Sequence, residues 1–207
     1  MTREVTLKGK VIATGPQALI ARPKLTSLMT AIFLLWSVAE QHIGMMFGLL
    51  LDSNADDAFD LFHAFNDLGP KQTAIRALAN KKLSAQLNEE IENMLKNLRK
   101  RSRVRNAIVH GLWAVSDDLP DEILKVDEKE FNRRFLLRMN RAKSGDTDDL
   151  ADDFEYDSMV FSAYNENDFR SNLEMLNQLS VLTQSLALKI SKEIVDATRQ
   201  QRSLQAL

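Results

Sequence analysis

One short stretch of the chain holds three side chains whose chemistry suits a phosphodiester bond: Arg105, Asn106 and His110. A histidine takes and gives protons near neutral pH, so it can serve as a general acid or base. An arginine binds a phosphate through two nitrogens and stabilises charge that builds up on phosphoryl oxygens. An asparagine can orient either group. With RNA, the 2′-hydroxyl supplies an internal nucleophile, so this set predicts cleavage that needs no metal, no cofactor and no protein nucleophile.

A long helix must position these residues. Ser84 is a good N-cap, and the 3.6-residue period that follows predicts a helix from there to about residue 110 or 112. Apolar residues at steps of three and four form a seam along one face of this helix: Leu87, Ile91, Leu95 and Leu98. We expect this seam to pack against the rest of the protein.

The phase of this helix separates the three residues. Continuing the apolar seam places Arg105 on the packed side, where an arginine costs free energy unless it is paired or hydrogen-bonded. Asn106 and His110 fall on the next stripe together with Arg103, because steps of three and four bring residues to one face. Arg105 therefore joins the other two only if its side chain escapes the core, most plausibly at a subunit interface.

The same helix carries a local concentration of positive charge. Residues 96–105 contain six cations and no acid, in a chain whose formal net charge is -2. We interpret Arg99, Arg101 and Arg103 as phosphate-binding residues for RNA. The alternative is a set of basic residues that complements the negative end of the helix dipole.

Arg105-Asn106-x-x-x-His110, followed by Gly111 and Trp113 late in a long helix, resembles the signature of the HEPN family. The resemblance covers residues 22–113 and the closing helix. It implies a metal-independent endoribonuclease that forms a homodimer, in which two copies of the motif face one cleft. It also implies a toxin or a defence protein, in some members paired with an antitoxin protein.

The resemblance also implies roles for individual residues. Arg105 would hold the phosphate, His110 would be the general acid and base, and Asn106 would support both. Many HEPN proteins carry an acidic residue on the first helix, and Glu40 is the candidate here, where it could pair with Arg105. The alternative for Glu40 is a charge that faces solvent.

The expected fold is mainly α: an antiparallel, HEPN-like helical bundle with a small β-strand appendage between the last two long helices. Residues 1–21 are expected to be irregular with at most one short strand, and residues 22–207 to form one domain. Within it, residues 113–164 form an insertion with two or three strands, at 123–126, 135–139 and 159–161. The helices are expected over residues 23–51, 55–68, 71–80, 84–112 and 167–201, with Gly69-Pro70 as a stop signal.

The insertion includes a strongly acidic segment. Residues 146–157 contain seven aspartates and glutamates, which predicts a solvated loop. A calcium loop is the alternative, but the required glycine and the terminal glutamate are missing. A further hypothesis is that this segment mimics a phosphate backbone and covers the basic stretch at rest.

Composition excludes several other classes. The chain has no cysteine, which rules out disulfides, thiolate catalysis and cysteine-ligated zinc. A net charge of -2 argues against a protein that coats nucleic acid without specificity. The apolar run 28–51 is long enough to span a bilayer, but Glu40, Gln41 and His42 lie in its middle. We therefore expect a central helix of a soluble bundle, no membrane association and a cytoplasmic location.

Two other functions remain open. The first is a non-catalytic HEPN-like module that binds RNA, a nucleotide or a partner protein, with Arg105 and His110 as a structural pair. The second is a helical interaction protein in which the motif has no function. Geometry separates them, because catalysis requires both side chains to open onto one cleft.

Overall fold

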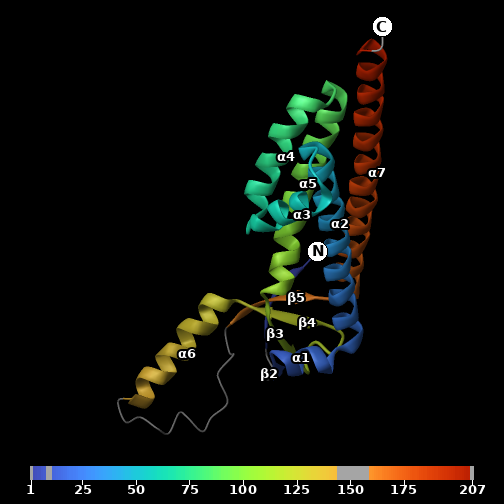
Figure 1. The fold of residues 1–207 in the computed structure, drawn as a ribbon. Helices are drawn as coiled ribbons and strands as arrows, with labels where there is room; N and C mark the ends of the chain where they lie inside the picture. Colours follow the sequence, from blue (N-terminus) through green and yellow to red (C-terminus); the bar gives the residue numbers. More distant parts are fainter. Residues whose placement is uncertain (1, 8–10, 144–158, 206–207) are drawn as a thin grey trace. The chain divides into compact units, whose positions relative to one another are not determined.

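The structure is a computed structural model that describes residues 2–7, 11–143 and 159–205. The described part is mainly helical, with seven helices and one five-stranded antiparallel sheet, so the predicted fold class is confirmed in its coarse form. Figure 1 shows these elements. The helices are α1 (Pro16–Ala21), α2 (Pro23–Leu51), α3 (Ala55–Ala64), α4 (Leu68–Lys82), α5 (Ala85–Val109), α6 (Glu128–Lys143) and α7 (Glu166–Gln205).

The sheet corrects the prediction of an appendage confined between the last two long helices. Its strands lie in the order β1-β5-β4-β3-β2, so the two N-terminal strands form its two edges. The central strands come from the predicted insertion, where the strands expected at 123–126 and 159–161 correspond to β4 and β5. The bounds are β1 (Arg3–Thr6), β2 (Val11–Thr14), β3 (Leu112–Ser116), β4 (Ile123–Val126) and β5 (Val160–Tyr164).

The N-terminal segment was expected to be irregular because its apolar pairs are short and interrupted by glycine. Its strands are stabilised by partners distant in sequence. Val5 lies opposite Phe161 on β5, and Ala13 lies opposite Val115 on β3. A strand of four residues gains its stability from such cross-strand pairs rather than from its own pattern.

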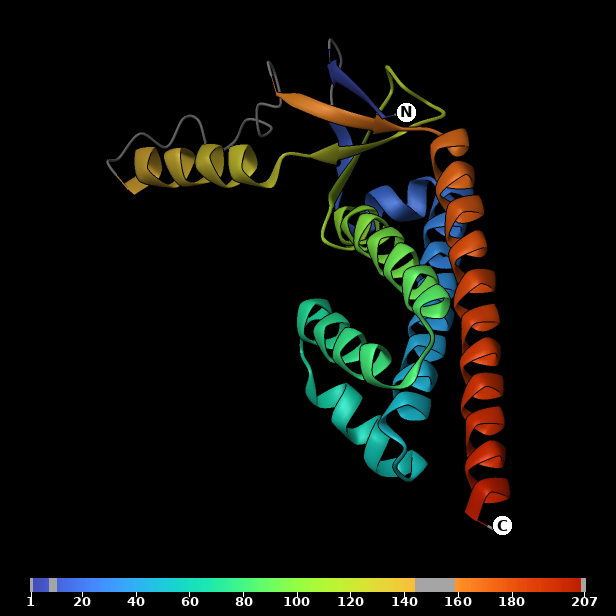
Figure 2. The same cartoon turned by 90° about the horizontal axis from the view of Figure 1, so that it is seen from above.

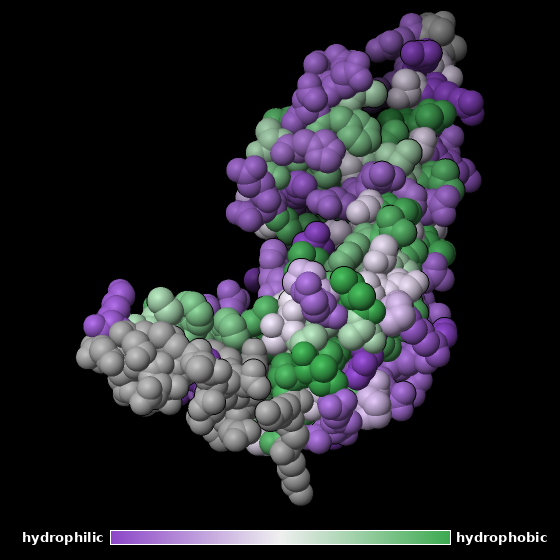
Figure 3. Space-filling view, turned by 90° about the horizontal axis from the view of Figure 1, so that it is seen from below, coloured by the Kyte–Doolittle hydropathy of each residue, from purple (hydrophilic) through white to green (hydrophobic). Residues whose placement is uncertain are grey.

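The strand predicted at residues 135–139 is wrong, because these residues lie within α6. The helix begins with a capping motif, in which the Oδ1 atom of Asp127 accepts a hydrogen bond from the Glu130 backbone nitrogen at 2.8 Å. Its interior is rich in Arg, Leu and Met, which are good helix formers. Four large apolar residues remain exposed along it, which are Phe135, Leu136, Leu137 and Met139. Figure 3 shows apolar surface on this part of the chain.

The stop signal predicted at Gly69-Pro70 is also displaced. Helix α4 begins at Leu68, so both residues lie in its first turn. A proline is tolerated there because the first backbone N–H groups of a helix have no partner within the helix. The predicted cap of α5 is confirmed, since the Leu87 backbone nitrogen donates to Oγ of Ser84 at 3.5 Å.

The chain divides into two compact units. Unit 1 holds residues 1–31 and 106–172, and unit 2 holds residues 32–105 and 173–207. Unit 1 therefore contains the sheet, α1, α6 and the last turn of α5. One face of its sheet carries a buried apolar cluster, and partly buried Phe131 of α6 packs against this cluster: Leu7, Ala114, Leu124, Val126, Met159, Phe161 and Ala163.

Unit 2 is built only from helices. Figure 2 shows α7 running alongside α2, and the Nδ1 atom of His42 lies 3.2 Å from Oγ1 of Thr183 across this contact. Helix α4 is joined to α5 by a buried hydrogen bond, in which Nε2 of Gln72 donates to the backbone oxygen of Leu95 at 3.2 Å. The largest buried side chains of the unit include Phe47, Phe62, Ile75, Ile91 and Leu95.

Helix α2 is long and apolar enough, by length and composition, to cross a membrane. Its apolar residues divide between two sides. Ile32, Ile43 and Phe47 are buried, whereas Leu34 is 64% exposed. A soluble helix packed on one side satisfies the same length and composition, so the predicted cytoplasmic location stays a prediction.

Candidate functional site

The motif residues lie at the carboxyl end of α5. The backbone nitrogen of His110 donates to the backbone oxygen of Asn106 at 3.0 Å, so the two residues are one helical turn apart. Both are exposed. The phase predicted from the sequence therefore holds for this pair.

The chain leaves α5 through a tight turn at Gly111. A Cβ atom at this position would lie 3.0 Å from the Trp113 ring and 3.1 Å from the Ala107 backbone oxygen. Trp113 is 5% exposed, and its Nε1 atom donates to the Ile108 backbone oxygen at 3.2 Å. The Gly-x-Trp sequence after the motif thus ends the helix and anchors it, because it satisfies one of the carbonyls that a helix end leaves unpaired. Trp113 is a core residue.

Arg105 ends the first segment of unit 2 and precedes Asn106 in the same helix. Its side chain is partly buried, and its Nε atom is fully buried. This agrees with the position on the packed seam that the phase predicts. The seam itself shifts at the end of the helix: Val109 follows Arg105 by four residues in the same phase but is 38% exposed, whereas Ile108 is 1% exposed.

His110 lines a groove in unit 1 with a volume of about 790 Å³. The groove is bounded by the sheet, by the end of α5 and by the first turn of α6. The residues that line it with His110 are Glu4, Lys125, Val126, Asp127, Glu128, Lys129, Glu130, Val160 and Ser162. No sequence pattern marks these nine as site residues, since strand pairing and the start of α6 bring them to His110 only in the folded chain.

The floor of this groove is a row of residues across three strands. Glu4 of β1 lies opposite Ser162 of β5, and Ser162 lies opposite Lys125 of β4. Residues directly opposite each other point to the same face of a sheet. This face is the reverse of the one that carries the buried apolar cluster, because side chains alternate along a strand. Lys125 is partly buried and has Trp113 of β3 as its other neighbour.

The wall of the groove is the capped start of α6. The carboxylate of Glu130 accepts hydrogen bonds from Arg133 at 2.8 Å and from Arg134 at 2.7 Å. These two arginines lower the pKa of Glu130 to about 2. Its negative charge is therefore balanced within α6. The carboxylate of Asp127 caps the start of the same helix.

The predicted phosphate-binding residues lie earlier on α5. Arg99 and Arg103 are exposed, as expected for residues that contact RNA. Arg101 is partly buried, and its Nε atom is buried without a hydrogen-bond partner in the part of the chain that the structure describes. Arg101 is thus less accessible than the other two.

The predicted supporting acid, Glu40, has a partner other than the one that the resemblance suggests. The Nζ atom of Lys71 donates to its Oε1 atom at 3.0 Å. The side chain of Lys71 is 9% exposed and that of Glu40 is 38% exposed. The ammonium of Lys71 also lies 4.4 Å from the centre of the Phe62 ring. This pair links α2 and α4 within unit 2.

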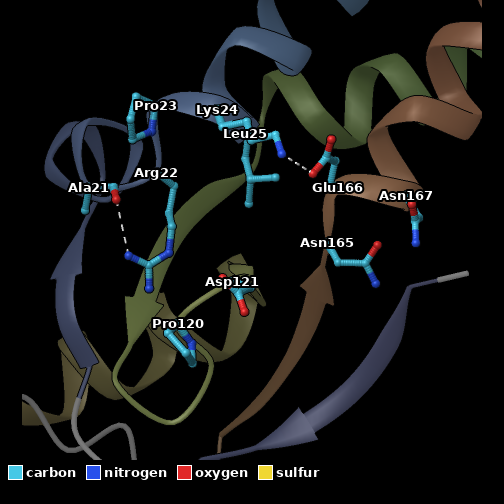
Figure 4. A pocket seen from close by; sticks show the side chains of 10 residues that line it. All are labelled: Ala21, Arg22, Pro23, Lys24, Leu25, Pro120, Asp121, Asn165, Glu166 and Asn167. Atoms are coloured by element: carbon cyan, nitrogen blue, oxygen red, sulfur yellow. Dashed lines mark hydrogen bonds and ion pairs between the residues drawn. The ribbon is translucent and has the colours of Figure 1, made fainter.

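A second pocket of unit 1 has a volume of about 410 Å³ and is shown in Figure 4. The Arg22 guanidinium in this pocket donates to three backbone oxygens: those of Glu122 at 3.1 Å, Ala21 at 3.2 Å and Leu119 at 3.5 Å. Its ammonium, from Lys24, forms an ion pair with Glu166. The cations of this pocket are thus held by the chain itself, which is typical of a structural site.

The acidic segment 146–157 lies outside the described residues, so the loop and its suggested covering role stay predictions. Within the described ranges, no group of three or more His, Asp or Glu side chains is arranged to hold a metal ion. No family model, no curated protein and no solved structure matches this chain.

Proposed function

We propose that this chain is a metal-independent endoribonuclease that cleaves RNA through the 2′-hydroxyl, with His110 as the group that moves the proton. The observation that carries the proposal is the exposure of the His110 ring in the groove of unit 1, one turn after exposed Asn106. A proton-transfer residue must be open to the substrate, and a histidine in the core would not qualify.

The reaction needs little from the protein. The 2′-oxygen attacks the adjacent phosphorus, and the bond from phosphorus to the 5′-oxygen of the next nucleotide breaks. One group takes the proton of the 2′-hydroxyl, and one group protonates the leaving 5′-oxygen. The products are a 2′,3′-cyclic phosphate and a free 5′-hydroxyl. Cations near the phosphate lower the barrier because charge grows on its oxygens.

The roles of the other motif residues follow from their place on α5. Asn106 orients the substrate or the imidazole from the turn before His110. Arg105 binds the phosphate with its guanidinium, and the exposed residues Arg99 and Arg103 bind further phosphates of the RNA.

The wider proposal follows the resemblance to the HEPN family. The fold is then an antiparallel HEPN-like bundle, and the enzyme is a cytoplasmic homodimer. In it, a second copy supplies the second His110, so one imidazole takes the proton and the other donates one. A role as a toxin or in defence, controlled by an antitoxin protein, belongs to the same proposal.

A second candidate is a non-catalytic module that binds RNA, a nucleotide or a partner protein. The observation that favours it is the burial of the Arg105 Nε atom, since a guanidinium fixed in the protein serves structure. This module would bind RNA in a salt-dependent manner and leave it intact.

RNA cleavage by the wild type and by His110→Ala, each with a chelator present, tests the proposal. We expect cleavage by the wild type and at least a hundredfold loss in the variant, since general acid–base catalysis contributes about 10²–10⁴-fold. His63→Ala is the matched control, because His63 is also exposed but lies on α3 in unit 2. Activity that survived His110→Ala would exclude this mechanism, and binding without cleavage by the wild type would favour the second candidate.

A further inference from the structure

The groove beside His110 contains two lysines that the motif does not include. Lys125 belongs to β4, the middle strand of the sheet, and Lys129 belongs to the first turn of α6. In the described part of the chain, neither lysine forms an ion pair or a side-chain hydrogen bond. Two of the four acids that line the groove with them are held within α6, since Asp127 caps the helix and Glu130 pairs with Arg133.

The position of Lys125 is unusual for a surface lysine. Its side chain is partly buried, between the row neighbours Trp113 and Ser162. The nearest acid of the same row, Glu4, is two strands away, on the far side of Ser162. Strands are about 4.8 Å apart, so this places the Glu4 and Lys125 backbones roughly 10 Å from each other. Among the described residues no acid lies within ion-pair distance of Lys125, so its ammonium is open to pairing with an anion from outside the chain.

We infer that Lys125, assisted by Lys129, binds an RNA phosphate in the groove where His110 acts. This inference rests on the proposed function and names residues of the site outside the motif. The ammonium of Lys125 contacts the phosphoryl oxygens, and the hydroxyl of Ser162 is available as a neighbouring donor. Because β4 is paired on both sides, Lys125 is held on a rigid element, which suits a group that positions a phosphate near a proton-transfer residue.

Binding of a fully 2′-O-methylated RNA oligonucleotide tests the inference separately from cleavage, because this RNA has no free 2′-hydroxyl to react. We expect Lys125→Gln to weaken binding about tenfold, which corresponds to one lost charged hydrogen bond. We also expect the slope of log binding constant against log salt to fall by about 0.7, the value for one phosphate contact on a single strand. Lys129→Gln should show a smaller loss in the same direction.

Two control variants keep the result interpretable. Lys125→Arg retains the charge and should retain most of the binding, so a loss in Lys125→Gln alone is due to charge rather than to misfolding. Lys192→Gln removes an exposed lysine of α7 in unit 2 and should change nothing. Equal binding by Lys125→Gln and Lys192→Gln would overturn the inference, as would absence of binding by the wild type. Neither result decides whether RNA is cleaved, which the His110→Ala comparison measures.

Discussion

The Nζ atom of Lys71 lies 3.0 Å from Oε1 of Glu40, and this ion pair joins α4 to α2 inside unit 2. The lysine is the more buried partner, and its ammonium also faces the Phe62 ring. Glu40 thus has a clear structural function, which is to supply the counter-charge that a nearly buried ammonium requires.

Glu40→Gln should destabilise the protein because it leaves the charge of Lys71 without its carboxylate. We expect a loss of about 1–3 kcal/mol in the free energy of unfolding, below the full cost of breaking a buried pair because Glu40 is partly exposed. Urea unfolding measures this. Glu92→Gln is the control, since the Arg76–Glu92 pair is more than a third exposed on both sides and should contribute about 0–1 kcal/mol. Equal losses in both variants would contradict this role.

Gly111→Ala should destabilise unit 1. The new Cβ atom would lie 3.0 Å from the Trp113 ring and 3.1 Å from the Ala107 backbone oxygen, so the turn or the ring must shift. A cost of about 1–3 kcal/mol is typical of such overpacking. Gly69→Ala has no atom within 4 Å of its new Cβ and should be neutral or stabilising. Thermal unfolding of both variants gives the comparison, and a stable Gly111→Ala protein would show that the turn is looser than described.

The ion pairs of Glu130 should make α6 sensitive to acid. Its folded pKa, about 2, lies below the ordinary value of 4.5, so the pairs stabilise the helix above pH 4.5 and are lost as the pH falls toward 2. An NMR titration of the Glu130 carboxyl measures this pKa. Replacing both Arg133 and Arg134 with glutamine should raise it toward 4.5, whereas Lys129→Gln should leave it low. A wild-type pKa near 4.5 would show that these pairs do not form in solution.

Arg105 should matter for activity through its charge. Arg105→Ala is expected to lower RNA cleavage by at least tenfold, because a phosphate contact is lost. Arg105→Lys keeps the charge but loses bidentate binding, so its cleavage rate should lie between those of the wild type and Arg105→Ala. The partly buried side chain makes a stability measurement necessary for both variants. Full activity in a folded Arg105→Ala protein would assign Arg105 to structure alone.

The sequence predicts the longest helices well because each carries a continuous run or period of apolar residues. The long helix around Ile91 and Leu95 and the closing helix are examples. The same period predicted the exposure of Asn106 and the partial burial of Arg105, since both depend only on phase within α5.

The sheet and the groove could not be predicted in the same way. The partner of Val5 is Phe161, and no local pattern encodes a pairing across that separation. Lys125 is near His110 for the same reason, since strand order brings them to one groove. Helix α6 was missed because the apolar residues 135–139 were interpreted as a strand. A signal for the helix was present, since Asp127 and Glu130 have the spacing of a capping box.

We propose that His110 serves cleavage through the 2′-hydroxyl of RNA. The most direct measurement compares an RNA oligonucleotide with the same sequence made entirely of 2′-deoxynucleotides, at equal enzyme concentration and with chelator. Our account predicts that the RNA is cut to products that carry a 2′,3′-cyclic phosphate, that the deoxy substrate stays intact, and that His110→Ala cuts neither. Cleavage of the deoxy substrate, or an intact RNA after incubation with the folded wild type, would contradict it.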